Sequence, residues 1–175
     1  MLDVRLIRRL LRALNGELKK ADIKGEVGLC GGAVMCLVFE ARKATKDIDA
    51  VFRPTREIRA AVKTVAKRFD LPEDWLNDAA KGFFTAAPPR EDVLDLAHLR
   101  VWAPSADYML AMKCVSARFD TQDADDAAFL VRWLNLKSPQ EVFSLIERYY
   151  PREKVPPKTQ FFVEEMFERR GRKKG

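Results

Sequence analysis

The chain has 175 residues, of which 47% are hydrophobic and 33% are charged, and its formal net charge is +6. This composition is typical of a soluble globular protein and excludes a disordered or fibrous chain. No apolar run is long enough to span a bilayer, and the first residues lack the apolar core of a secretory signal, so we expect a cytoplasmic protein without membrane contact. Three cysteines without a C-x-x-C pair argue against a disulfide framework or a zinc ribbon. The positive charge favours acidic partners such as nucleotides, RNA or DNA.

Hydrophobic periodicity predicts the elements in chain order. Leucines at every fourth position from residue 6 to residue 18 indicate an amphipathic helix over residues 2–20, whose basic outer face is either solvated or in contact with phosphates. Strands are predicted over residues 26–30, 48–52, 93–96 and 99–102. Further helices are predicted over residues 33–40, 55–69, 106–118, 124–135, 139–149 and 158–170, with a short one beginning at Pro72. Residues 81–92 contain a glycine and two prolines and are predicted to form a loop.

This order of elements predicts an α/β (α+β) fold, in which helices flank a small mixed sheet. We expect a core with its amino-terminal helix over residues 1–103 and a helical carboxyl-terminal part over residues 104–168. Residues 169–175 form a strongly basic tail, which is either a solvated terminus or a contact for acidic partners.

The residues that carry chemistry are concentrated between residues 26 and 52. Asp47 and Asp49 open the second predicted strand, and residues i and i+2 of a strand point to the same face, so both carboxylates are expected to project together. Gly31 and Gly32 lack a Cβ atom, so their N–H groups can approach phosphates closely. The sequence therefore predicts a binding site for Mg²⁺ and a nucleoside triphosphate in this stretch.

This stretch resembles the signature of the nucleotidyltransferase superfamily with the DNA polymerase beta-like fold. The match consists of Cys30-Gly31-Gly32, a fourteen-residue spacer, and Asp47-Ile48-Asp49-Ala50. Thr45 also fits, because many members carry Ser or Thr there. Lys46, with Arg42 and Lys43, forms a basic connector that either reaches the triphosphate or is solvated. The likeness is closest to small bacterial members of the abortive-infection and toxin–antitoxin type.

The resemblance implies a fold and an activity. It implies a nucleotidyltransferase fold and a Mg²⁺-dependent enzyme that moves a nucleoside monophosphate from a nucleoside triphosphate onto a hydroxyl acceptor. The implied acceptor is an RNA such as tRNA, or a protein. The resemblance also implies a role in a toxin–antitoxin or phage-defence system, with a cognate partner protein.

The same resemblance assigns roles to residues outside the central stretch. Asp95 is the candidate third catalytic carboxylate, since the superfamily supplies one from a strand beyond the Asp pair. Lys113 ends the run Met109-Leu110-Ala111-Met112-Lys113, which Ala117-Arg118 follows; this resembles a helix of apolar residues, Lys and then Ala-x-Arg that in the resembling families presents the lysine to the nucleotide. Arg118 completes that pattern. Asp123 and Asp126 either cap the next helix or orient Lys113 or Arg118.

Two other functions stay open. Without a firm third carboxylate, and with a spacer slightly longer than usual, the chain also fits a catalytically degenerate copy of the fold that acts as a binding or antitoxin-like module. A DNA-binding regulator that uses the basic first helix and the tail is the other alternative. It is disfavoured because the sequence has no helix-turn-helix or zinc pattern.

Overall fold

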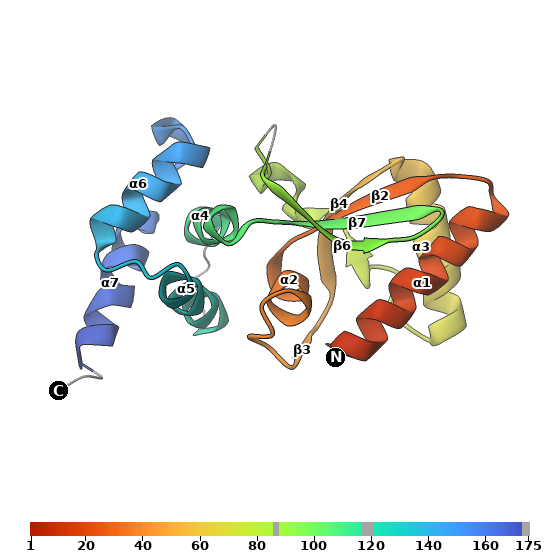
Figure 1. The fold of residues 1–175 in the computed structure, drawn as a ribbon, viewed down its shortest axis with the longest axis horizontal. Helices are drawn as coiled ribbons and strands as arrows, with labels where there is room; N and C mark the ends of the chain where they lie inside the picture. The colour runs from red at the N-terminus through yellow and green to blue at the C-terminus, as the bar shows by residue number, and fades with distance from the viewer. Residues whose placement is uncertain (86–87, 117–120, 173–175) are drawn as a thin grey trace. The chain divides into compact units, whose positions relative to one another are not determined.

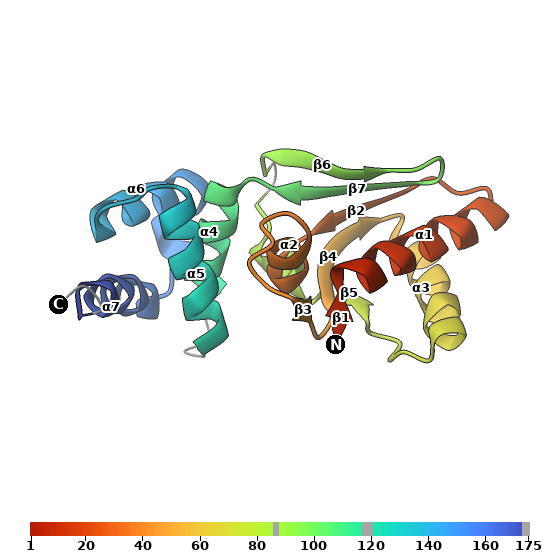
Figure 2. The same ribbon diagram turned by 60° about the horizontal axis from the view of Figure 1, so that its bottom comes forward.

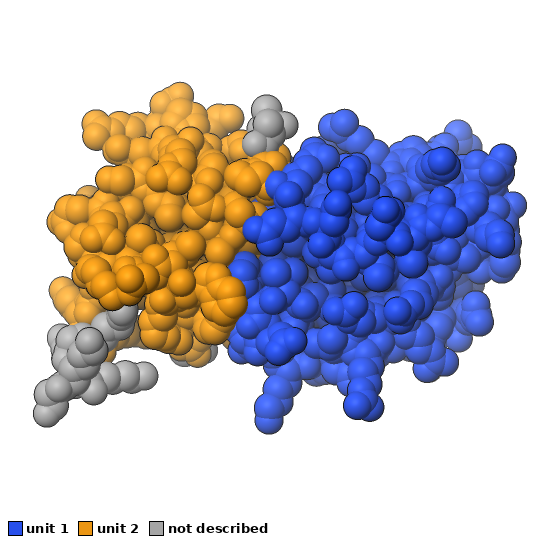
Figure 3. All heavy atoms as spheres, in the orientation of Figure 1, with its two compact units in different colours: residues 1–82, 90–104 blue, residues 83–89, 105–175 orange. Residues whose placement is uncertain are grey.

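The computed structural model describes residues 1–85, 88–116 and 121–172, which form a mixed α+β protein. The chain divides into two compact units (Figure 3). Unit 1 comprises residues 1–82 and 90–104, and unit 2 comprises residues 83–89 and 105–175. The expected α+β class is confirmed. None of the described helices combines the length and the apolar character that crossing a bilayer requires.

The secondary-structure elements are labelled in Figure 1. Unit 1 contains β1 (Leu2–Asp3), α1 (Val4–Lys20), β2 (Gly25–Leu29), α2 (Gly31–Leu37), β3 (Ala44–Thr45), β4 (Ile48–Arg53), α3 (Thr55–Phe69), β5 (Leu76–Asn77), β6 (Arg90–Asp95) and β7 (Leu99–Pro104). A 3-10 helix covers Ala79–Phe83. Unit 2 contains α4 (Ala106–Ser116), α5 (Thr121–Trp133), α6 (Pro139–Tyr149), a 3-10 turn (Arg152–Lys154) and α7 (Lys158–Arg172).

A five-stranded mixed sheet organises unit 1. Its strand order is β5-β4-β2-β7-β6, with β2 antiparallel to β4 and parallel to β7. Alternate residues of β2 and β4 face α1 and α3, which lie on one side of the sheet in Figure 2. The apolar side chains on this face are fully or almost fully buried and comprise Val27, Leu29, Ile48, Ala50 and Phe52.

Helix α1 forms where the leucine periodicity predicted it. The carboxylate of Asp3 caps its first turn by accepting a hydrogen bond from the backbone N–H of Leu6 at 2.7 Å. The side chains buried against the rest of unit 1 are Ile7, Leu10, Leu11, Leu14 and Leu18. The predicted helix differs only at its start, because residues 2 and 3 pair with β3 instead. The predictions over residues 55–69 and 139–149 are confirmed, the second with Ser138 as its N-cap.

The opposite face of the sheet carries a tryptophan that lies directly on a glycine. A Cβ atom on Gly28 would lie 2.2 Å from a ring carbon of Trp102, so only glycine permits this contact. The Glu26 carboxylate accepts hydrogen bonds from Trp102 Nε1 at 3.0 Å and from Arg90 Nη1 at 2.9 Å. The Arg90 guanidinium lies 4.3 Å from the centre of the Trp102 ring, so it covers the indole.

Two glycine-to-alanine changes are expected to shift stability in opposite directions. Gly28→Ala forces the Trp102 ring to move, and overpacking of this kind costs about 1–3 kcal/mol. Gly16→Ala places a methyl group in open space inside α1 and is expected to stabilise the protein by about 0.5–1 kcal/mol. Urea unfolding followed by circular dichroism measures both. Equal effects of the two variants would contradict this account.

Three local predictions differ from the structure, two in their bounds and one in its type. The helix predicted over residues 33–40 begins earlier, at Gly31. The short helix predicted at Pro72 is absent from the described residues; a turn there leads into β5, whose pairing with β4 satisfies the backbone of Leu76 and Asn77. The loop predicted over residues 81–92 holds the end of a 3-10 helix and the start of β6. Trp75, directly before β5, is a core residue: it is 2% exposed, and its indole N–H donates to the Val62 carbonyl.

Unit 2 is built around α4, whose side chains from residue 108 to residue 115 are all buried. The Tyr108 hydroxyl accepts a hydrogen bond from the Thr85 N–H at 2.7 Å, which attaches Thr85 to this helix. The first turn of α4 is joined to α6, because the Tyr149 hydroxyl donates to the Asp107 carboxylate. Burial raises the pKa of the Cys114 thiol to about 12, so this cysteine is an unreactive core residue.

Candidate functional site

The glycine turn lies against the strand that carries the Asp pair. The Cys30 N–H donates to the Asp49 carbonyl at 2.9 Å, which joins the end of β2 to the start of β4. Gly31 has a φ of +59°, a conformation that side chains rarely adopt. A Cβ atom on Gly31 would lie 3.0 Å from Asp49 Oδ2. The missing side chain therefore leaves the carboxylate directly beside the turn.

The second glycine of the turn faces a hydroxyl and a guanidinium. A Cβ atom on Gly32 would lie 2.4 Å from Thr45 Oγ1 and 3.4 Å from Arg42 Nη1. Thr45 is buried. It belongs to β3, and it lies opposite Leu2 of β1 in the strand pairing. The structure thus brings together Gly31, Gly32, Thr45 and Asp49, and it adds Arg42 as a bordering cation.

Asp47 and Lys46 lie in the bend between β3 and β4. Asp47 is half-buried and Lys46 is exposed. Within the part of the chain that the structure describes, Asp47 makes no hydrogen bond or ion pair. Its carboxylate, two residues before Asp49, can therefore accept a ligand without losing a protein contact.

Asn77 is a site neighbour that the sequence reasoning missed. Strand β5 runs parallel to β4 and pairs Asn77 with Asp49, so both side chains lie on the same face of the sheet. The Asn77 side-chain oxygen accepts a hydrogen bond from the Ala79 N–H at 3.0 Å. The phrase Trp75-Leu76-Asn77 was visible in the sequence. The sequence pattern predicts that it continues the helix from Pro72, and a two-residue strand has too little periodicity to indicate otherwise.

The structure does not bring Asp95 to the Asp pair. Asp95 is exposed at the end of β6, and in the strand register it lies opposite Arg100 of β7. Arg100 lies opposite Glu26 of β2, and Glu26 lies opposite Arg53 at the far end of β4. Asp95 therefore lies three strands away from Asp49 across the sheet, which is about 14 Å, and four residues away along the strand direction, which is about 13 Å. The cause is the register of the β6–β7 hairpin, which a strand prediction alone cannot supply.

The residues at the turn fit a magnesium ion that arrives with phosphates. Among the described residues, no group of three or more His, Cys, Asp or Glu side chains is placed to hold a metal. Mg²⁺, however, is usually bound through one or two carboxylates, with substrate phosphates and water as the other ligands. Asp47 and Asp49 supply hard oxygen donors of this kind, and the space that a Gly31 side chain would fill lies beside Asp49.

The remaining predicted residues belong to unit 2. Lys113 Nζ lies 2.8 Å from Asp123 Oδ1 and 2.7 Å from Asp126 Oδ2, so one ammonium joins α4 to two carboxylates of α5. The side chains of Lys113 and Asp126 are 9% and 4% exposed. Arg118 lies outside the described residues.

Comparison with known proteins leaves the family open, because no protein-family model, no curated protein and no solved structure matches the chain.

Proposed function

We propose that unit 1 is a Mg²⁺-dependent nucleotidyltransferase domain, which moves a nucleoside monophosphate from a nucleoside triphosphate onto a hydroxyl acceptor. The observation that carries the proposal is the contact of the Gly31-Gly32 turn with Asp49 and Thr45, because a side chain on either glycine would occupy the space beside them. A carboxylate beside a turn of two glycines suits a ligand that combines phosphate with a hard cation.

Each residue has a distinct role in the proposed reaction. Asp47 and Asp49 would hold the magnesium ion, which when bound polarises the α-phosphate and offsets its charge. The backbone of Gly31 and Gly32 binds phosphate oxygens, with the Arg42 guanidinium at the edge of the turn. The acceptor oxygen forms a bond to the α-phosphorus, the α–β phosphoanhydride bond breaks, pyrophosphate leaves, and the hydroxyl proton passes to water.

Thermal stability with nucleotides tests this function. With Mg²⁺ present, one nucleoside triphosphate at about a hundred times its dissociation constant is expected to stabilise the protein by roughly 2.7 kcal/mol. For a chain of this size the melting temperature then rises by about 5–10 °C. Asp47→Asn is expected to remove the shift, whereas Asp22→Asn, at an exposed turn, is expected to keep it. A shift that needs no Mg²⁺, or that Asp47→Asn preserves, would contradict the proposed metal ligand.

A catalytically degenerate module is the second candidate. It is favoured by the lack of a third carboxylate next to the pair among the described residues. This candidate predicts a nucleotide-dependent shift without transfer of labelled nucleotide to RNA or protein. If the protein is the proposed enzyme, we expect both the nucleotide-dependent shift and the transfer of labelled nucleotide. A toxin–antitoxin setting with a partner protein stays a prediction from the resemblance.

A further inference from the structure

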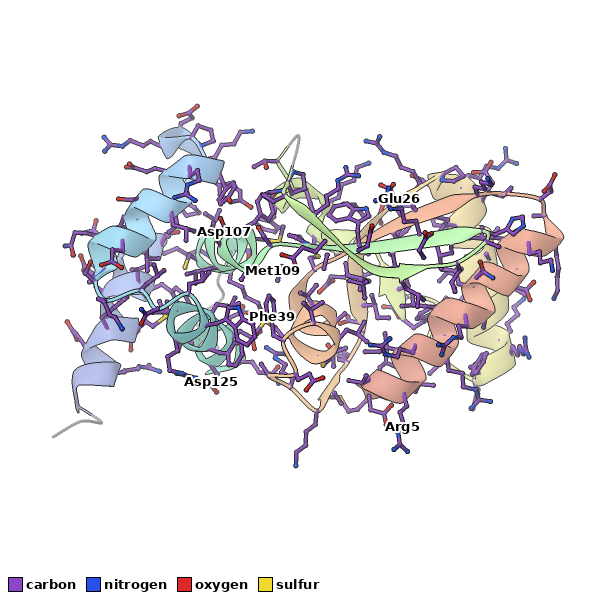
Figure 4. The ribbon with its side chains drawn as sticks, in the orientation of Figure 1. Arg5, Glu26, Phe39, Asp107, Met109 and Asp125 are labelled. Atoms are coloured by element: carbon purple, nitrogen blue, oxygen red, sulfur yellow. The ribbon has the colours of Figure 1, made fainter. Side chains whose placement is uncertain are left out.

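Helix α1 presents a stripe of basic side chains on its outer face, which we call the arginine stripe. Its members are Arg5, Arg8, Arg9, Arg12 and Lys19. The four arginines are spaced i, i+3, i+4 and i+7, so they occupy an arc of roughly 100° on one face of the helix. That face is opposite the leucines that pack into the core. Figure 4 shows Arg5 on the first turn of α1, with its side chain pointing outward.

The stripe is a region of uncompensated positive charge. Across the described chain, no carboxylate lies within 4.0 Å of any of its cationic groups. Five other exposed cations of unit 1 have such partners, whereas further ones, among them Lys24, Arg56 and Lys67, have none within the described residues; the pairs are Lys20 with Glu17, Arg59 with Asp78, Lys63 with Glu73, Arg90 with Glu26 and Arg100 with Asp92. Neighbouring like charges without partners repel one another, and a bound polyanion would relieve that repulsion.

A second helix widens the basic surface. Arg9 and Arg68 lie over the Phe69 ring, with their guanidinium carbons 4.9 Å and 5.6 Å from its centre. Phe69 ends α3, which packs against α1. The aromatic ring therefore positions a guanidinium from each helix, and arginines held in this way lose less side-chain freedom when they bind an anion.

The stripe begins next to the candidate site. Strand β1, directly before α1, pairs with β3, so Asp3 lies opposite Ala44 and Leu2 lies opposite Thr45. Thr45 borders the glycine turn. From Arg5 to Lys19 the stripe then extends about 21 Å away along the helix.

We propose that the arginine stripe binds the phosphate backbone of a nucleic acid. A duplex carries one negative charge per about 1.7 Å, so its backbone can meet several of these cations at once. Arginine suits this ligand, because its planar guanidinium donates two parallel hydrogen bonds to a phosphate. A membrane surface is a poorer partner, since the apolar face of α1 is buried in the protein and is not available to enter lipid. The inference also names nucleic acid as the acceptor of the proposed transfer reaction. Only this acceptor role rests on the proposed function, whereas binding by the stripe does not.

Fluorescence anisotropy with a short RNA hairpin and a DNA duplex of equal length tests the proposal. The test variant replaces Arg5, Arg8, Arg9 and Arg12 with glutamine. Each lost phosphate contact weakens binding by about five- to eightfold at 0.1 M salt, so the loss of four contacts is expected to weaken binding by roughly 600-fold or more for whichever nucleic acid binds. The slope of log affinity against log salt should also become shallower by about three. The corresponding lysine variant keeps the charge and is expected to keep most of the affinity.

A matched control removes the same charge from elsewhere on unit 1. It replaces the exposed, ion-paired cations Lys20, Arg59, Lys63 and Arg100 with glutamine. Retained affinity in this control supports the stripe as the binding surface. The proposal is overturned if both variants lose the same affinity for nucleic acid, or if binding does not depend on salt. It is also overturned if the protein binds vesicles of anionic lipid but neither nucleic acid. Asp47→Asn is expected to keep nucleic-acid binding, so a failure of catalysis and a failure of this inference give different results.

Discussion

Asp49→Asn is expected to lower the rate of nucleotide transfer by about 10²–10³-fold. The change keeps the shape of the side chain but removes the negative charge that the proposed magnesium ion needs. Metal-based stabilisation of a developing phosphate charge amounts to several kcal/mol, and each 1.4 kcal/mol is a factor of about ten in rate. Transfer of labelled nucleotide to total RNA, and separately to protein, measures the effect.

Asp95→Asn is the matched control for this measurement. It makes the same chemical change on the same sheet, at the other end and three strands away. We expect it to leave the rate within about twofold, because exposed charges separated by more than a Debye length of about 8–10 Å are largely screened. If Asp95→Asn instead lowers the rate as strongly as Asp49→Asn, the third-carboxylate role predicted from the resemblance is restored and the sheet register described here is wrong.

Lys113→Met is expected to destabilise the protein by about 3–5 kcal/mol. The lysine ammonium lies between two carboxylates, and its removal leaves the almost fully buried Asp126 without this cation. Methionine keeps most of the volume of the side chain, so the loss reports mainly on charge. Urea unfolding followed by circular dichroism measures the difference in free energy.

A second variant separates the charge effect from packing. Lys113→Met combined with Asp126→Leu removes the buried carboxylate together with its cation, and buried pairs replaced in this way often recover their stability. We expect the double variant to regain at least half of the loss. An unchanged unfolding midpoint in Lys113→Met would show that the ion pair contributes little to joining α4 and α5. Because two carboxylates already engage its ammonium, we favour this structural role for Lys113 over the nucleotide contact that the resemblance implied.

The sequence alone determined the features that depend on local spacing. The leucine repeat placed α1 and its basic outer face, and Ser138 followed by Pro139 placed the start of α6. The Asp-Ile-Asp opening placed β4. These features are visible because helix and strand periods, caps and glycine positions act within a few residues of one another.

Only the tertiary structure decided which distant residues meet. It placed Gly31 beside Asp49 and Asn77 in register with it, and it separated Asp95 from both. It also buried Lys113 between two carboxylates. Strand order and register are set by long-range packing, and a shift of one residue turns every side chain of a strand to the other face. Local patterns do not specify strand order or register, which is why the contact of the glycine turn with Asp49 and Thr45 becomes visible only in the folded unit.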